Sequence, residues 1–239
     1  MTERLDLADA TFMHASATVL EATPLGIVLD RSPFYPRAGG QPGDAGHLDW
    51  PGGPTRITEA RKGEGATVLH VPAEGDPLPN PGTQVEAHLD LPRRLAHMRM
   101  HTALHLLCSL LPGAGVTGGQ IGADRSRLDL DLPAAPDRDT LEQGFAALVA
   151  ADHPVTSTWV AESVLDTNPG LVRTLSVQPP RGIGRLRLIR IGTGDPPVDL
   201  QPCGGTHVAR TGLIGRVHIL KLENKGRQNR RIIIGLQEA

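Results

Sequence analysis

The chain has 239 residues, and its 24 Lys and Arg nearly balance its 26 Asp and Glu, giving a formal net charge of −2 at pH 7. This balance excludes a basic coat over the whole surface, so any contact with nucleic acid must come from local patches. With two Trp, one Tyr and three Phe, the chain has too few aromatic rings for a binding surface built on stacked bases.

Residues 1 to about 71 alternate between short β-prone segments and clusters of Gly, Pro and Asp, which predicts a small barrel or curled sheet. The stretch 72–82 has four prolines and little to bury, and is expected to be a loop near a domain boundary. We therefore expect an N-terminal β-barrel domain over residues 1–88. Its predicted strands are Ala17–Leu20, Gly26–Leu29, His47–Trp50, Thr55–Ala60 and Thr67–Val71.

A long helix is predicted next. Asp90 suits the N-cap position, and Pro92 suits the first turn. An apolar stripe with helical spacing runs to about Leu111, where Pro112 and Gly113 end it.

The rest of the chain predicts a second domain over residues 89–239. We expect Gly113–Gly122 to be a Gly-rich loop, and Thr140 with Gln143 to form a capping box at the start of a second helix. Two helices among many strands predict an α+β fold, here a two-layer sandwich with helices on an antiparallel sheet. The expected strands lie at 127–132, 155–160, 172–177, 185–191, 207–209, 214–222 and 231–236.

Two histidines stand four residues apart on the predicted long helix. His101 and His105 project from the same helical face about one turn apart, so both imidazoles can reach one ion. His97 and His101 have the same spacing, and a solvated or buried histidine stripe explains this pattern equally well.

A second motif shifts the balance toward a metal site. Cys203 and His207 flank a Gly-Gly-Thr turn, whose glycines are expected to take backbone angles closed to other residues. They offer a thiolate and an imidazole, which with His101 and His105 make a nitrogen and sulfur donor set that favours zinc.

Two cysteines are too few for a disulfide framework. The first residues lack a basic region followed by an apolar run, and no stretch approaches the roughly eighteen apolar residues of a membrane span. A reducing, cytoplasmic setting without a membrane partner is therefore expected. Cys108, in a Leu-rich helix, is interpreted as a core residue, and His97 as a residue behind the ligands or facing solvent.

Four motifs occur in order along nearly the whole chain: FYPRAGGQPGD at Phe34–Asp44, HTALH at His101–His105, CGGTH at Cys203–His207 followed by VARTG, and the pair Arg230 and Arg231. Together they resemble the alanyl-tRNA editing domain family, and in particular its free-standing AlaX-type trans-editing proteins. The combination of HxxxH with CGGTH about a hundred residues later is far more specific than either half.

The resemblance implies a small β-barrel joined to an α+β editing domain that hydrolyses the ester holding a wrong amino acid on the 3′ end of alanine tRNA. Serine is the main amino acid implied, and glycine is left open. The implied cofactor is Zn²⁺, held by His101, His105, Cys203 and His207, and the implied partner is mischarged alanine tRNA. Because motifs for an ATP-dependent synthetase domain are missing, we expect neither aminoacylation nor a need for ATP.

In the family, a Gly-rich motif is linked to the discrimination of serine, which assigns Gly39, Gly40 and Gln41 to substrate binding. Arg37 and Ala38 stand here where the family typically has an acidic residue and a glycine. A hairpin turn is the alternative interpretation of this stretch.

Recognition of serine requires a polar side chain near the ester, because a site that hydrogen-bonds the hydroxyl rejects an analogue without it. Thr102 and Gln120 are the candidates, and a packed helix residue and a loop residue are the alternatives. Four protein ligands would close a tetrahedral shell, so His207 or Cys203 is expected to stand off, and His207 could then act as general base.

The tRNA must be held by local positive charge. The C-terminal quarter, which includes Arg230 and Arg231, is the most basic region, and Arg185, Arg187 and Arg190 belong to a second cluster. The alternative function is a non-catalytic tRNA-binding or synthetase-accessory module with a structural zinc. An unrelated metallohydrolase is less favoured because no HExxH motif is present. The sequence leaves the oligomeric state open.

Overall fold

The computed structural model describes residues 1–175, 179 and 181–237. They fall into two compact units, Met1–His97 and Met98–Ala239. The division lies within helix α2 (Leu91–Leu110), and the domain boundary expected after residue 88 stays a prediction. The end of the strand expected at 172–177 lies outside the described residues.

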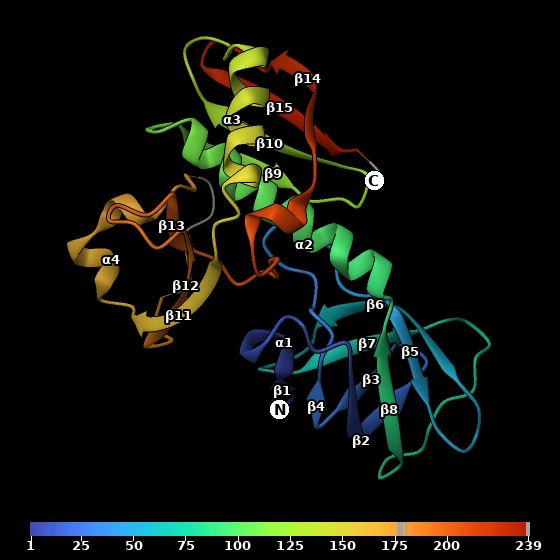
Figure 1. Cartoon of the computed structure of the whole chain (residues 1–239). Coiled ribbons are helices and arrows are strands. Elements are labelled where there is room, and N and C mark those ends of the chain that lie inside the picture. The colour runs from blue at the N-terminus through green and yellow to red at the C-terminus, as the bar shows by residue number, and fades with distance from the viewer. Residues whose placement is uncertain (176–178, 180, 238–239) are drawn as a thin grey trace. The chain divides into compact units, whose positions relative to one another are not determined.

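A closed antiparallel barrel dominates the first unit, with the strand order β2-β3-β7-β6-β5-β8 (Figure 1). All five strands predicted for this region are confirmed, and β8 (Gln84–Leu89), which is not among them, closes the barrel by pairing with both β2 and β5. The short elements β1 (Glu3–Arg4), α1 (Leu5–Ala8) and β4 (Arg31–Ser32) complete the unit. The predicted strands appear as β2 (His14–Thr23), β3 (Gly26–Leu29), β5 (Gly46–Asp49), β6 (Thr55–Lys62) and β7 (Val68–Pro72).

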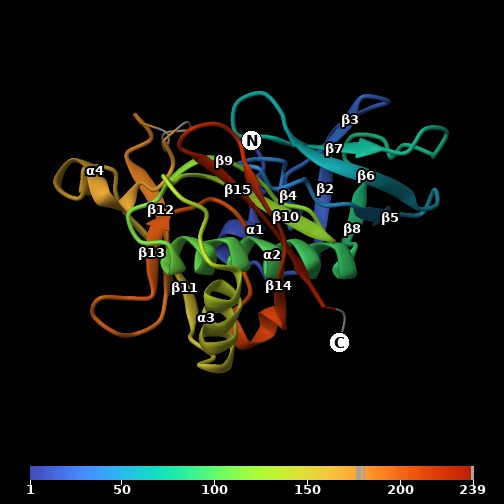
Figure 2. The same ribbon diagram turned by 90° about the horizontal axis from the view of Figure 1, so that it is seen from above.

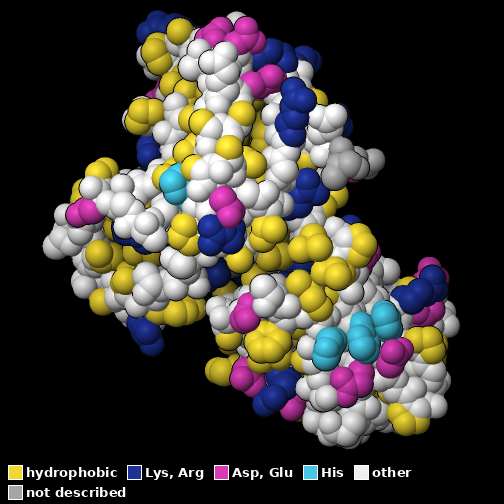
Figure 3. All heavy atoms as spheres, viewed as in Figure 1, with side chains coloured by type: hydrophobic (Ala, Val, Ile, Leu, Met, Phe, Trp, Pro, Cys, Tyr) yellow, Lys and Arg dark blue, Asp and Glu magenta, His cyan; other side chains and the backbone are white. Residues whose placement is uncertain are grey.

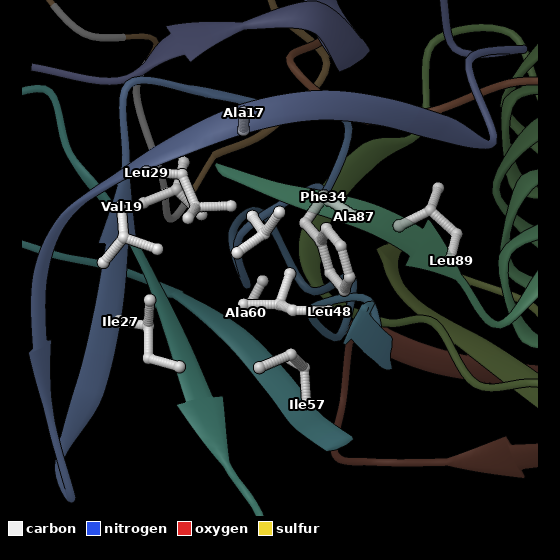
Figure 4. Packing of buried hydrophobic residues seen from close by; sticks show 12 residues of the cluster. Ala17, Val19, Ile27, Leu29, Phe34, Leu48, Ile57, Ala60, Ala87 and Leu89 are labelled. Carbon is white, nitrogen blue, oxygen red and sulfur yellow. The ribbon is translucent and has the colours of Figure 1, made fainter. Parts of the chain in front are cut away.

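The barrel encloses one apolar cluster (Figure 4). Alternate residues of the strands point inward, and Ile27, Leu29 and Leu48 are fully buried. Phe34, which follows β4, is also fully buried in this cluster. The expected small β-barrel is thereby confirmed.

A buried ion pair anchors the start of α2 in the same unit. The Arg94 guanidinium is fully buried and donates to Asp44 from Nε, at 3.0 Å to Oδ1 and 2.9 Å to Oδ2. It also donates to the carbonyl oxygens of Ala10 and Pro33. Asp90 caps the helix as predicted, since its carboxylate accepts a hydrogen bond from the Arg93 N–H at 3.1 Å.

The second unit contains a four-stranded antiparallel sheet in the order β14-β15-β10-β9. Its strands are β9 (Gly115–Gln120), β10 (Arg125–Asp131), β14 (Val217–Asn224) and β15 (Asn229–Leu236). Helix α3 (Arg138–Ala150) packs against β14 and buries Leu141 and Phe145 (Figures 1 and 2). Helix on antiparallel sheet is the α+β architecture that we expected.

Two local predictions for this sheet and its helix are wrong. Gly113–Gly122 is not a loop, because Gly115–Gln120 forms β9, which pairs along β10 with one register shift. Helix α3 is capped by Asp137, whose carboxylate accepts a hydrogen bond from the Thr140 N–H at 2.8 Å, and not by a capping box at Thr140.

The second unit also contains a smaller antiparallel sheet, in the order β11-β12-β13. It consists of β11 (Val155–Ala161), β12 (Arg185–Ile191) and β13 (Asp199–Pro202), with α4 (Val164–Thr167) and the 3₁₀ turns Pro169–Leu171 and Thr211–Ile214 nearby in sequence. The strand expected at 207–209 is not formed, because these residues belong to the loop after β13. Within the described part of the chain, no helix is both long and apolar enough to cross a membrane.

Candidate metal centre

Helix α2 supplies two imidazoles to the centre of the second unit. His101 and His105 are 8% and 5% exposed, and their ring centroids lie 5.3 Å apart. Four residues are about one helical turn, so the helix alone brings both rings to one face.

The loop after β13 supplies the other two side chains, Cys203 and His207. Its start is held by Arg187 of β12, whose Nη1 donates to the carbonyl oxygens of Cys203 (3.2 Å) and Gly205 (2.8 Å). Gly204 and Gly205 are not among the glycines with positive φ, so the turn does not use the special backbone angles that we expected.

The four side chains converge on one point. Their ligand atoms all lie within 4.8 Å of one another, and Cys203 Sγ is 3.4 Å from Nε2 of both His101 and His207. A tetrahedral zinc with bonds of about 2.3 Å to sulfur and 2.0–2.1 Å to nitrogen separates these donors by about 3.6 Å. The observed spacing therefore fits a shared ion with little adjustment.

Thr102 sets the tautomer of His207. Its hydroxyl donates to the Met98 carbonyl oxygen at 2.8 Å and accepts a hydrogen bond from the Val208 N–H at 3.2 Å. Because the single hydroxyl hydrogen is already used, the 3.2 Å contact with His207 Nδ1 must be donated by the imidazole. Nε2 of His207 is left with its lone pair toward Cys203, as a ligand requires.

Asp199 plays the corresponding part for His105. Nδ1 of His105 lies 2.8 Å from Asp199 Oδ2, and the Gln201 amide donates to the same oxygen at 2.9 Å. The carboxylate only accepts, so His105 carries its hydrogen on Nδ1 and keeps Nε2 for a metal.

The surroundings also shift the pKa values of the cluster. Burial raises the pKa of Cys203, but its interactions with His101 and His207 outweigh burial and hold the pKa well below its usual range. Burial lowers the pKa of His105, yet hydrogen bonds to Asp199 and the Cys203 thiolate raise it to about 10. Burial and the charge of His101 lower the pKa of His207. Cys203 is thus ready as a thiolate, while an ion must displace a proton from His105.

The chain resembles proteins of known name over its whole length. Residues 186–233 match the model of the threonyl and alanyl tRNA synthetase second additional domain, and residues 7–93 match that of class II (A) tRNA synthetases. The alanyl-tRNA editing proteins AlaX-M of Methanosarcina mazei and Methanosarcina barkeri are each 35% identical to it over 248 residues. These matches cover 99% of the chain and 97% and 99% of the two relatives. The chain belongs to the AlaX-M family.

The resemblance inferred from the sequence motifs is thereby confirmed. The alanine–tRNA ligase of Pyrobaculum neutrophilum is also 36% identical over 206 residues, which are 82% of the chain but 22% of the ligase. The chain therefore matches a segment that makes up a small part of that ligase.

Thr102 and Gln120, the predicted polar substrate contacts of this AlaX-M family member, differ from each other in burial. Thr102 is fully buried and its hydroxyl already makes three hydrogen bonds, which leaves no capacity for a substrate hydroxyl and favours the packed helix residue. Gln120 is exposed at the end of β9, not in a loop, and its side-chain carbonyl accepts a hydrogen bond from Arg127 Nε at 3.3 Å. Its contact with substrate stays a prediction.

The Gly-rich segment of the AlaX-M motif forms a tight turn in the first unit. Gly39 and Gly40 have φ angles of 54° and 81°, and Ala38 and Gln41 exchange backbone hydrogen bonds across them. Two successive positive φ angles are typical of a type I′ hairpin turn, which explains the two glycines. The glycines are exposed, whereas Gln41 is fully buried.

The two arginines expected to bind tRNA are engaged within the protein. Arg230 is 9% exposed and donates to backbone carbonyl oxygens, including those of Gly226 (2.9 Å) and Asn229 (3.1 Å). Arg231 binds the Asp129 carboxylate with two hydrogen bonds of 2.7 and 2.9 Å. Both arginines therefore hold the strand β15 region together, and their role in tRNA binding stays a prediction.

Three residues that position the cluster were not among the predicted site residues. Asp199 and Gln201 orient His105, and Arg187 holds the Cys203 loop instead of belonging to an exposed basic cluster. Alternation along Asp199, Gln201 and Cys203, which puts the three on one side of an extended segment, is the signal that could have identified two of them.

Two further residues of helix α2, Cys108 and His97, were considered near the predicted ligands. Cys108 is buried in the core as expected, and burial together with the Asp199 charge raises the pKa of its thiol to about 12. His97 is 2% exposed, so the solvent-facing alternative for it is wrong.

Proposed function

We propose that the chain is a zinc-dependent aminoacyl-tRNA deacylase that hydrolyses the ester between a wrong amino acid and the 3′ end of alanine tRNA. Serine is the proposed main substrate, and glycine the second. Membership of the AlaX-M family supports an editing role. The observation that carries the proposal is the convergence of three imidazoles and one thiolate within 4.8 Å.

His101, His105, Cys203 and His207 would hold the Zn²⁺. The donor set has the softness and the nitrogen and sulfur mixture that zinc prefers, and its ring orientations are set by hydrogen bonds behind the ligands. When bound, zinc supplies Lewis acidity that polarises an ester carbonyl or lowers the pKa of a water molecule to about 7.

The protein's own contribution is to fix the donors before substrate arrives. Thr102 holds His207, Asp199 holds His105, and Arg187 holds the loop that carries Cys203. The lowered pKa of His207 keeps its imidazole neutral, which suits a ligand and makes it a weak base. These contacts support His207 as a ligand more than as the general base.

Substrate contacts are proposed on the family motif. The exposed turn at Gly39 and Gly40 leaves open space around Gly39, where an added Cβ would meet nothing within 4 Å. Gln120, exposed at the end of β9, is the proposed polar contact with the amino acid. The exposed Arg216 and Arg227 are better placed than Arg230 and Arg231 to meet phosphates, because their side chains are not buried.

A deacylation assay tests the proposal directly. The protein is incubated with alanine tRNA charged with serine, glycine or alanine, and remaining ester and bound zinc are measured. We expect rapid loss of Ser-tRNA, slower loss of Ala-tRNA, and loss of both activity and zinc in Cys203→Ala and His101→Ala. Cys108→Ala is the matched cysteine control and should keep both. Intact Ser-tRNA after incubation with excess zinc-loaded protein would refute the deacylase.

The alternative is a tRNA-binding or synthetase-accessory module in which zinc is purely structural. The observation that favours it is that four protein donors at one point would saturate a tetrahedral ion. In that case Ser-tRNA would bind in a salt-sensitive manner without being hydrolysed. Removal of zinc would then lower the stability of the protein, and there would be no catalytic rate to lose.

A further inference from the structure

A second group of metal-ligating side chains lies on the outer face of the barrel. His47 and Asp49 of β5 and His88 of β8 offer ligand atoms within 4.8 Å of one another. Histidine side chains stand side by side on this unit, with acidic side chains next to them (Figure 3). The group lies within the first unit, and the proposed function uses none of it.

The register of the barrel strands builds this group. His47 lies directly opposite His88 in the β5–β8 pairing, and His14 of β2 lies opposite His88 on its other side. Leu48 and Ala87 are fully buried in the barrel, so the alternating histidines point outward. Three neighbouring strands thus each present one histidine at the same level, and the rings of His47 and His88 stack at 5.0 Å.

A row of acidic side chains follows two residues further along the same face. Asp49 lies opposite Glu86, and the Ser16 hydroxyl donates a hydrogen bond to the Glu86 carboxylate. The nearest basic side chain in register, Arg56 opposite His47, is paired through two donors with Asp76. Two carboxylates beside these imidazoles therefore favour a cation at this position.

The distances fit a shared ion better than hydrogen bonds. Asp49 Oδ2 lies 3.4 Å from His47 Nε2 and 3.6 Å from His88 Nε2, beyond the usual range of about 2.7–3.2 Å for an N–H···O bond. Donors bound tetrahedrally at about 2.0–2.2 Å are separated by about 3.4 Å. The two rings are nearly parallel, at 16°, and would turn about χ2 to aim both Nε2 atoms at one ion. That torsion is broad, and the side chains are 44% and 36% exposed.

We propose that His47, His88 and Asp49 form a second, solvent-exposed site for Zn²⁺, independent of the candidate metal centre. Two imidazoles and one carboxylate suit first-row divalent transition metals and not Ca²⁺ or Mg²⁺, which take oxygen donors. Water completes the coordination, because all three side chains are open to solvent.

Equilibrium dialysis of the full chain against micromolar free Zn²⁺ tests the site, with bound metal counted per chain. We expect two equivalents in the natural sequence and one in the double variant His47→Gln/His88→Gln. Asp49→Asn should weaken the second equivalent at least about tenfold. The control His218→Gln removes a histidine outside the group and should keep two. Thermal unfolding before zinc addition checks that each variant is folded.

The outcomes separate the two metal sites. If Cys203→Ala keeps one equivalent that His47→Gln/His88→Gln abolishes, the surface site stands whatever the fate of the candidate metal centre. If His47→Gln/His88→Gln binds as much zinc as the natural sequence, the surface site is overturned. If in that case the natural sequence binds one equivalent and only Cys203→Ala loses it, the zinc belongs to the candidate metal centre, whose proposal then stands.

Discussion

Replacement of Thr102 by valine separates a positioning role from a substrate contact. Valine keeps the shape of the side chain but removes the hydroxyl, so the His207 Nδ1–H and the Val208 N–H lose their acceptor in a buried place. A buried donor without a partner costs about 1–3 kcal/mol, so two donors predict a loss of about 2–6 kcal/mol in the free energy of unfolding. Because the His207 tautomer is no longer fixed, zinc affinity should also fall about 10–100-fold.

Two measurements check this prediction. Denaturant unfolding gives the free energy, and competition with a chelator gives the zinc affinity. Thr102→Ser is the matched control, since it keeps the hydroxyl and should stay close to the natural protein in both. If Thr102→Val retains stability and zinc affinity but no longer distinguishes Ser-tRNA from Ala-tRNA, Thr102 contacts the substrate and the positioning argument is refuted.

Three further predictions concern charged groups. Asp199→Asn should lower zinc affinity about 10–100-fold in a chelator competition, because the His105 imidazole loses its anionic acceptor; unchanged affinity would contradict this. The pKa of His105 is about 10, so its proton is present near neutral pH and must be released on binding. Zinc affinity should therefore rise about tenfold per pH unit between about pH 6 and pH 8, and a flat profile would disprove the coupling. Arg94→Met leaves the buried Asp44 carboxylate without its partner and should cost about 3–5 kcal/mol in denaturant unfolding, whereas a loss below about 1 kcal/mol would show that the pair is dispensable.

The barrel strands could be predicted where local signals agree. Gly26–Leu29 and Thr55–Ala60 combine β-prone residues with flanking Gly and Pro, so their sequence alone specifies extended chain. β8 carries a comparable signal, because Val85, Ala87 and Leu89 alternate with polar residues shortly after Pro81 and Gly82, yet it is not among the predicted strands. The local sequence does not reveal its pairing partners, because β2 and β5 are distant in sequence.

The conformation of strand β9 also depends on pairing that the local sequence does not reveal. Gly118 and Gly119 lower the intrinsic preference for a strand, and only the neighbouring β10 supplies the hydrogen bonds that extend this segment. Tertiary pairing therefore overrides the local sequence, and Gln120 becomes a strand residue.

The metal-binding prediction depended on spacing, which is visible in sequence. His101 and His105 are one helical turn apart, and Cys203 and His207 flank one short turn. The residues behind them are not visible in this way, because Thr102 meets His207 across 105 positions of sequence. The zinc role of the four stays a prediction until metal is measured.

Strand β8 also determines when the barrel can form during synthesis. It is the last barrel strand to be made, yet it pairs with β2, the first, and with β5. Until Leu89 has left the ribosome, β2 and β5 each expose a row of unpaired backbone groups that can pair with another chain. A fragment ending before Gln84 should therefore aggregate, whereas one that includes Leu89 can close the barrel. Because this closure joins distant segments, it should also be a slow step of folding.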